Sequence, residues 1–193
     1  MNMLAEKVVA RPDDLLAIPD GHRYELVDGK LLERHMGSVS SWIGGELYAR
    51  LRDYVNGNRF GRVFPADAGY DCFPRGNVRY PDVSVVRYGP LADEELPEGH
   101  IKLAPDFAAG VVSPNDKAGE LEEKLLDYRA AGVGLVWVIY PDTRAARAHR
   151  PDRSTTEYAA DDVMSGEAVL PGFSVRLGDL FPTPAAGPAP AGG

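Results

Sequence analysis

Three consecutive segments decide the fold: YPDVSVV (residues 80–86), PDFAAGVVSPND (105–116) and ELEEKLLDYRAAGV (120–133). The first two each contain an apolar run of strand length. The second run stops at Ser113–Pro114, a pair that breaks regular structure. The third segment repeats apolar residues at helical spacing and ends at Gly132. We therefore expect two strands followed by a helix.

Downstream of these segments the sequence predicts more strands. Residues 135–140 (LVWVIY) are fully apolar, as in a strand that is buried on both faces. Together with the strand at 107–112 and the helix at 120–131, they predict a parallel strand–helix–strand unit. Later strands are predicted at residues 146–150, 155–158 and 174–177.

Upstream, the sequence predicts a hairpin and a long helix. Strands at 24–27 and 30–33 flank Asp28–Gly29, a type I′ turn signal. Apolar residues recur every four positions through 39–55, as in a helix packed on a sheet. The triplet at 56–58 (NGN) is expected to end this helix in the left-handed conformation.

The whole pattern predicts an α/β (α+β) fold, with a mixed β-sheet core flanked by helices and hairpins. We expect one domain over residues 1–181 and a disordered Pro/Ala/Gly tail at 182–193. Residues 62–64 and 69–73 are predicted as strands or a bent hairpin, and residues 78–86 as a further strand.

Composition limits the classes of function. The 193 residues carry a net charge of −8, which disfavours tight, sequence-independent binding of nucleic acid. Cys72 is the only cysteine, so an internal disulfide or a cysteine-based zinc cluster is excluded. The sequence shows no secretory signal and no apolar run of membrane length, and we expect a cytoplasmic location.

The candidate site residues have ordinary interpretations when they are taken one at a time. Asp82 follows Pro81, which interrupts a sheet ladder and displays the carboxylate, but such pairs also occur at plain strand edges. The spacing of Glu120 and Lys124 favours a solvated helical ion pair. Taken together, a carboxylate at a strand end, a neighbouring strand and a lysine are typical of a metal-dependent phosphodiesterase site.

The segments YELVDGKLL, RYPDVSVV, PDFAAGVVSPND, EEKLLDYRAAGVGLVWVIYPDT and VLPGFSVRLGDLF resemble the Uma2 family of endonucleases, within the PD-(D/E)xK nuclease superfamily. The resemblance covers nearly the whole chain and implies a restriction-endonuclease-like fold. It also implies hydrolysis of nucleic-acid phosphodiester bonds, with DNA as the expected substrate, and Mg²⁺ (or Mn²⁺) as the cofactor.

The resemblance assigns roles to individual residues. Asp82 matches the metal-binding aspartate, and Val111 matches the residue whose backbone carbonyl completes the metal shell. Lys124 matches the catalytic lysine, which has moved onto the helix. Glu25 and Glu46 match acidic positions near the site. Asp82, Lys124, Glu46 and Glu25 are therefore the catalytic candidates, and Asp82 and Val111 are the metal ligands.

Gly110 occupies the position where the family has a glutamate. Close backbone packing is one explanation, and loss of the ligand without structural purpose is the one that we favour. Two hypotheses follow: an endonuclease that is weakened, and an inactive relative that binds nucleic acid or a protein partner. We also expect a homodimer, because open sheet edges need to be covered and cutting a duplex favours two-fold symmetry.

Overall fold

A six-stranded mixed sheet organises the computed structural model, which describes residues 11–35, 37–91 and 95–183. The strand order is β3–β4–β5–β6–β7–β8. Strands β5 and β6 are parallel, joined by helix α3 (Ala118–Ala130), and the other neighbours in this sheet are antiparallel. The predicted parallel unit is therefore confirmed. The strands are β3 (Gly61–Pro65), β4 (Val83–Arg87), β5 (Phe107–Val111), β6 (Leu135–Tyr140), β7 (Ala145–His149) and β8 (Thr155–Tyr158).

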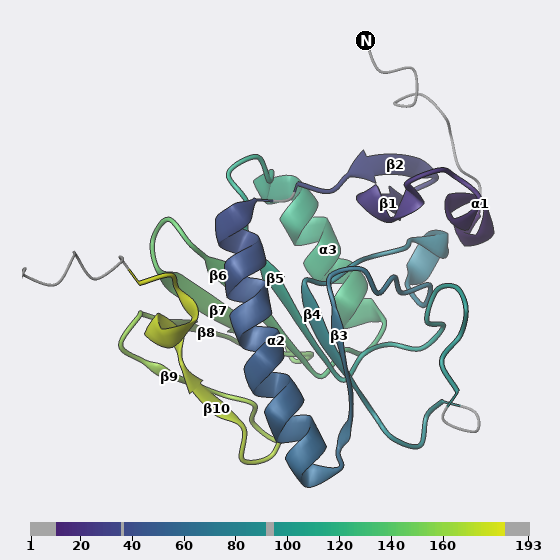
Figure 1. The fold of residues 1–193 in the computed structure, drawn as a ribbon. Helices are drawn as coiled ribbons and strands as arrows, with labels where there is room; N and C mark the ends of the chain where they lie inside the picture. The colour runs from purple at the N-terminus through teal and green to yellow at the C-terminus, as the bar shows by residue number, and fades with distance from the viewer. Residues whose placement is uncertain (1–10, 36, 92–94, 184–193) are drawn as a thin grey trace, which may run out of the picture.

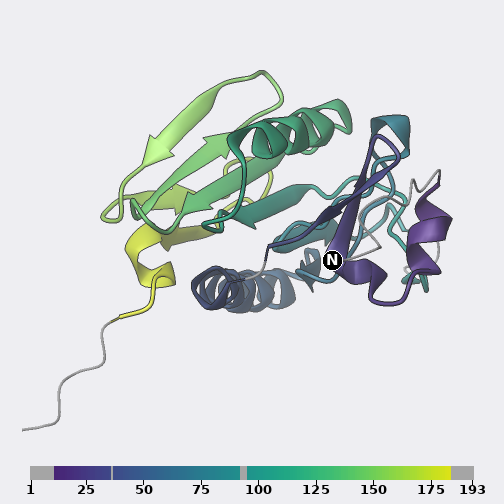
Figure 2. The same ribbon diagram turned by 90° about the horizontal axis from the view of Figure 1, so that it is seen from above.

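Two helices cover opposite faces of this sheet (Figures 1 and 2). Helix α2 (Ser38–Asn58) packs on one face, where its apolar stripe joins Phe107, Ala109 and Val111 of β5 in one core cluster. Helix α3 packs on the other face, in a cluster that includes Ala108. Because side chains alternate along a strand, Gly110 lies on the α3 face.

The predicted hairpin forms as a separate two-stranded sheet. Strands β1 (Tyr24–Val27) and β2 (Lys30–Glu33) pair with the expected register, and the turn residues Asp28 and Gly29 have φ angles of 50° and 73°. These angles are those of a type I′ turn. A bridge between Leu26 and Val78 fixes the hairpin beside the chain that leads into β4. This docking brings β1 to the site described below. The short helix α1 (Pro12–Leu16) precedes the hairpin.

A second small sheet lies next to α2. It contains β9 (Val163–Ser165) and β10 (Ser174–Arg176), whose residues Met164 and Val175 join the α2-side core. The sequence predicted a strand at 174–177 but none at 163–165, because the segment between residues 158 and 174 is rich in turn formers.

Other boundaries also differ from the sequence predictions. The strand expected at 78–86 begins only at Val83, because Val78 and Arg79 bridge to the hairpin and to Tyr70 instead of entering the sheet. Residues 69–73 form no strand, and Tyr70 alone makes bridges there, one to Arg79 and one to Ile101. Helix α2 runs through the triplet 56–58, and Arg59 takes the left-handed conformation, with φ of 49°.

Most of the predicted tail, residues 184–193, lies outside the described residues, so the domain boundary stays a prediction. Within the described part of the chain, no helix is long and apolar enough to cross a membrane.

Candidate active site

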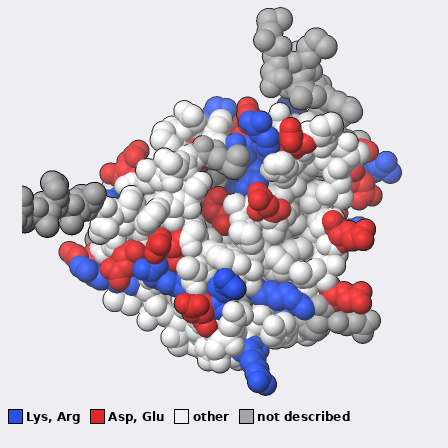
Figure 3. Space-filling view, viewed as in Figure 1, with Lys and Arg blue, Asp and Glu red and all other residues white. Residues whose placement is uncertain are grey.

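A pocket of about 320 Å³ opens where the hairpin, α2, β5 and α3 meet. Four of the predicted site residues line it: Glu25, Asp82, Val111 and Lys124. Gly110 lies in the same wall. On the face that carries α2, acidic and basic side chains are interspersed, and the coloured surface shows no broad basic patch (Figure 3).

Asp82 is fixed at the sheet end of this pocket. Its N–H donates to the Ala109 carbonyl at 2.9 Å, and its Oδ2 accepts a 2.7 Å hydrogen bond from the Val111 N–H. Helix α2 passes close by, since a Cβ on Gly44 would lie 3.7 Å from the Asp82 Cβ. Burial raises the pKa of Asp82, and the charge of Lys124 and the Val111 hydrogen bond oppose that rise.

Lys124 points from α3 toward the chain segment that precedes Asp82. Its Nζ donates to Glu25 Oε1 at 2.7 Å and to the Tyr80 carbonyl at 3.1 Å. The ion pair between Glu120 and Lys124 that helical spacing favoured is not formed. Glu120 pairs with Lys117 at 2.8 Å instead. The lysine ammonium is therefore held at the pocket by two partners that are distant in sequence.

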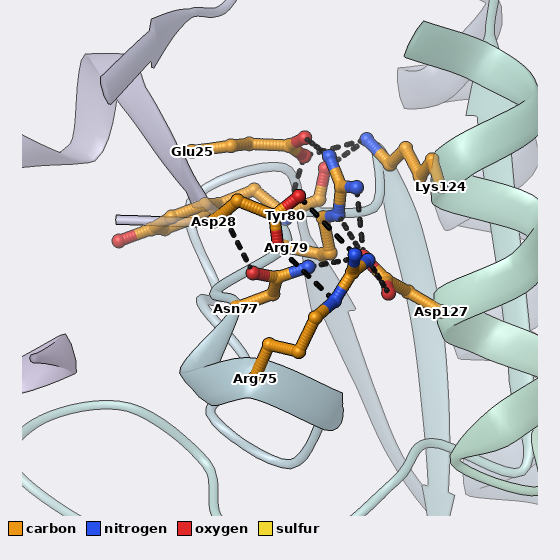
Figure 4. A network of polar contacts seen from close by, with 8 residues as sticks. All are labelled: Glu25, Asp28, Arg75, Asn77, Arg79, Tyr80, Lys124 and Asp127. Carbon is orange, nitrogen blue, oxygen red and sulfur yellow. Dashed lines mark hydrogen bonds and ion pairs between the residues drawn. The ribbon is translucent and has the colours of Figure 1, made fainter. Parts of the chain in front are cut away.

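Glu25 belongs to a buried network that links β1 to α3 (Figure 4). Arg79 Nη1 donates to Glu25 Oε2 at 2.9 Å, and Arg79 Nε donates to Asp127 Oδ2 at 2.8 Å. Asn77 donates to the same Asp127 oxygen at 2.9 Å. Burial raises the pKa of Glu25, but the nearby charges of Lys124 and Arg79 lower it by more, to about 2. Glu25 is thus a carboxylate saturated by cations and hydrogen-bond donors.

The structure places Glu46 away from the pocket. Its carboxylate lies 2.5 Å from Arg50 Nη1 on the same helix, and Arg50 also donates to the Asp179 carbonyl. The α2 residues that line the pocket are Ser40, Ser41, Gly44, Gly45 and Tyr48. Glu46 is therefore on a different side of α2, and its predicted place near the site does not agree with the structure.

Gly110 leaves open space in the pocket wall. A Cβ built on this residue would meet no atom within 4 Å, apart from its chain neighbours. Its φ angle is not in the left-handed region that favours glycine. Close backbone packing therefore does not explain this glycine.

The donor set can be compared with the needs of a divalent cation. No group of three or more His, Cys, Asp or Glu side chains suited to a metal occurs among the described residues. Glu25 is engaged by Arg79, Lys124 and the Tyr80 N–H, whereas Asp82 accepts one hydrogen bond, at Oδ2. Mg²⁺ is commonly held by one or two carboxylates, with water and substrate phosphates as the other ligands. Asp82 alone meets the lower limit of that requirement.

Sequence analysis missed two residues that support the site, Arg79 and Asp127. Arg79 stands three positions before Asp82, but nothing in the strand pattern showed that it is buried. Asp127 lies three residues after Lys124, on the same side of the helix, and that spacing is the one signal that could have indicated it.

Comparisons with known proteins bear on the family and the fold of the chain. The profile of the Uma2 family, described as "Putative restriction endonuclease", matches residues 12–178. The chain is also similar to the crystal structure described as "a putative nuclease belonging to DUF820 from Anabaena variabilis ATCC 29413". That similarity has a TM-score of 0.77 at 22% identity, over 89% of this chain and 97% of the other, and it shows the shared fold. No curated protein matches the sequence.

Proposed function

The chain belongs to the Uma2 family, and on that basis we propose that its pocket hydrolyses nucleic-acid phosphodiester bonds, at low efficiency. The observation that carries the proposal is the Lys124 ammonium, which is held 2.7 Å from Glu25 in the same pocket as Asp82. A fixed cation beside a carboxylate at a strand end is suited to a phosphate group and to the charge that develops on it.

Asp82 and the Val111 carbonyl are the groups that we propose for a divalent cation, Mg²⁺ or Mn²⁺. When bound, such an ion would polarise a phosphoryl oxygen and lower the pKa of a bound water. Because burial raises the pKa of Asp82, protonation competes with cation binding at this carboxylate. Metal affinity should therefore rise with pH until Asp82 is fully ionised.

Lys124 is the proposed catalytic residue of the chain itself. Its ammonium would orient the attacking water or balance the negative charge on the transferred phosphoryl group. For Glu25 we propose a positioning role in place of the catalytic role that the resemblance implies, because its two oxygens accept hydrogen bonds from Arg79, Tyr80 and Lys124. Glu46, which is paired with Arg50, has no part in this proposal.

DNA as the substrate, a homodimeric state and a cytoplasmic location remain proposals. The dimer is supported by the edge strand β8, whose residues are mostly exposed. Sedimentation at micromolar concentration tests the dimer, and a single monomeric species would contradict it.

A second candidate function is favoured by Gly110. Gly110 supplies no carboxylate, and no group of three or more side chains suited to a metal occurs among the described residues, so the chain could bind nucleic acid or a protein partner without cleaving it. The two functions differ in one measurable property, turnover that depends on a divalent cation.

Plasmid cleavage separates these two functions. We expect slow cleavage with Mg²⁺ or Mn²⁺ by the unaltered chain, and loss of cleavage in Asp82→Ala and in Lys124→Met. Glu46→Gln is the matched control and should retain the activity of the unaltered chain. Cleavage that survives Asp82→Ala would show a contaminating nuclease or a different site, and binding without cleavage would favour the second candidate.

A further inference from the structure

The side chain of Arg79 is 1% exposed and is held from two sides. On one side its Nη1 donates to Glu25 Oε2 at 2.9 Å. On the other side its Nε donates to Asp127 Oδ2 at 2.8 Å, and its Nη2 lies 2.7 Å from the same oxygen. A planar guanidinium has donors in a fixed fork, so it sets the orientation of both carboxylates. Arg79 thus joins β1 of the hairpin to α3 (Figure 4).

This arrangement determines which oxygen of Glu25 is left for Lys124. Arg79 takes Oε2, while Oε1 accepts from the Tyr80 N–H at 3.0 Å and from Lys124 Nζ at 2.7 Å. Rotation of the Glu25 carboxylate would break the contact with Arg79. The position of the Lys124 ammonium therefore depends on a residue that it does not contact.

Asp127 would compete for the same lysine if Arg79 were absent. It lies three residues after Lys124 on α3, a spacing at which helical ion pairs form. At present Asp127 Oδ2 is engaged by Arg79 and Asn77. Glu25 and Asp127 both face Arg79, and the exposed Arg75 lies 3.7 Å from Asp127. Removal of Arg79 would leave the two carboxylates with only Lys124 and the more distant Arg75 among the cations of this cluster.

We propose that Arg79 is a positioning residue that neutralises Asp127 and orients Glu25, and thereby keeps the Lys124 ammonium at the pocket. Its value for catalysis rests on the proposed function, whereas the placement of Lys124 can be measured without substrate or metal.

The test is NMR of the lysine ammonium groups, in which a held ammonium gives a signal in slow exchange with water. We expect such a signal for Lys124, identified by its loss in Lys124→Met. The signal should be lost or broadened in Arg79→Met and in Arg79→Lys, because an ammonium cannot reproduce the two-sided fork. Arg75→Met is the matched control: Arg75 is 57% exposed and lies 3.7 Å from Asp127, and its ion pairs are with Asp28 and Asp127, not with Glu25.

A double variant distinguishes positioning from a general loss of structure. In Arg79→Met with Asp127→Asn the competing carboxylate is gone and the charges of Glu25 and Lys124 balance again. The Lys124 signal should then return, which a purely structural role of Arg79 would not produce. If Arg79→Met does not fold, Arg79→Lys supplies the single variant.

Two outcomes would overturn the proposal: an unchanged Lys124 signal in a folded Arg79 variant, and a double variant in which the signal stays lost. Absence of plasmid cleavage would contradict the proposed function, but it would not affect the inference that Arg79 positions Lys124. Where cleavage can be measured, Arg79→Lys should lower kcat by roughly tenfold to a hundredfold with KM little changed.

Discussion

Two sides of one pocket differ in how completely they are built. On one side, Glu25, Arg79, Lys124 and Asp127 form a network in which each charge faces an opposite charge at 2.7–2.9 Å. On the other side, the wall at Gly110 carries no side chain, and a Cβ there would meet nothing within 4 Å. The first side holds the Lys124 ammonium in place, and the second has room for a side chain at position 110.

The contrast indicates that the charged network around Lys124 is tied to folding stability, whereas a side chain at position 110 is not. Buried charges must be paired, so residues of the network cannot be lost singly without a large penalty. A side chain that projects into an open pocket can be lost at little cost to the fold. Decay of an active site would therefore begin at a position such as Gly110.

The largest effect is expected from breaking the network. Arg79→Met leaves Glu25 and Asp127 buried with one fewer cation, and we expect the free energy of unfolding to fall by about 3–5 kcal/mol. Arg75→Met removes an exposed partner of Asp28 and Asp127 and should cost about 1 kcal/mol or less. Urea denaturation measures both variants. If both variants lost the same free energy of unfolding, the contrast between the buried Arg79 and the exposed Arg75 would be contradicted.

Lowering the pH should reduce the free energy of unfolding by a comparable amount, because it protonates Glu25 in this network. The pKa of Glu25 is lowered from 4.5 to about 2 by Lys124 and Arg79, against the effect of burial. A lowered folded-state pKa gives stability that is present above pH 4.5 and is lost as pH falls from 4.5 toward 2. The loss should reach about 3 kcal/mol.

Unfolding free energies measured across this pH range, for the unaltered chain and for Glu25→Gln, check the prediction. The glutamine variant starts from lower stability at neutral pH and should show a shallower slope between pH 4.5 and 2. Parallel slopes for the two proteins would mean that Glu25 is not the group responsible.

A smaller effect, on metal affinity, is expected from adding a side chain at Gly110. Gly110→Glu places a carboxylate near Asp82 and should tighten Mg²⁺ or Mn²⁺ binding by roughly tenfold, about 1.4 kcal/mol. Gly110→Gln has the same shape without the charge and is the matched control. Calorimetry gives the affinities, and Gly110→Glu should also raise cleavage, which Asp82→Ala in that background should abolish. A glutamate variant that binds metal no better than the glutamine variant would refute a vacant ligand position.

Sequence patterns predicted much of the fold, because turns, strands and helices depend mainly on residues that are close together in the sequence. The Asp28–Gly29 turn gave the hairpin, and the apolar segments flanking the helix at 118–130 gave the parallel β5–α3–β6 unit. Helix α2 was found, although Arg59 and not the NGN triplet ends it. Local pattern failed at residues 78–82, where a chain that looks like strand bridges to the hairpin instead.

The site was less predictable, because its contacts are distant in sequence. Spacing favoured Glu120 as the partner of Lys124, whereas its actual partner, Glu25, is 99 positions away. The burial of Arg79 depends on the hairpin and α3 closing over it, which no property of its sequence neighbours shows. Family resemblance named Asp82, Val111 and Lys124, and their catalytic and metal-binding roles stay predictions.

The smallest expected effect is on folding stability, and it tests whether Gly110 has a structural purpose. Gly110→Ala should raise the free energy of unfolding by about 0.5–1 kcal/mol, because glycine in a strand costs that much and the added methyl group meets no atom within 4 Å. Gly61→Ala is the matched control on strand β3, where the added Cβ would lie 2.7 Å from the Arg87 Cα, and it should destabilise. Urea denaturation of the two variants compares an open strand glycine with a closely packed one. If Gly110→Ala destabilises as Gly61→Ala does, the glycine serves the fold, and the contrast between the built and the open side of the pocket loses its basis.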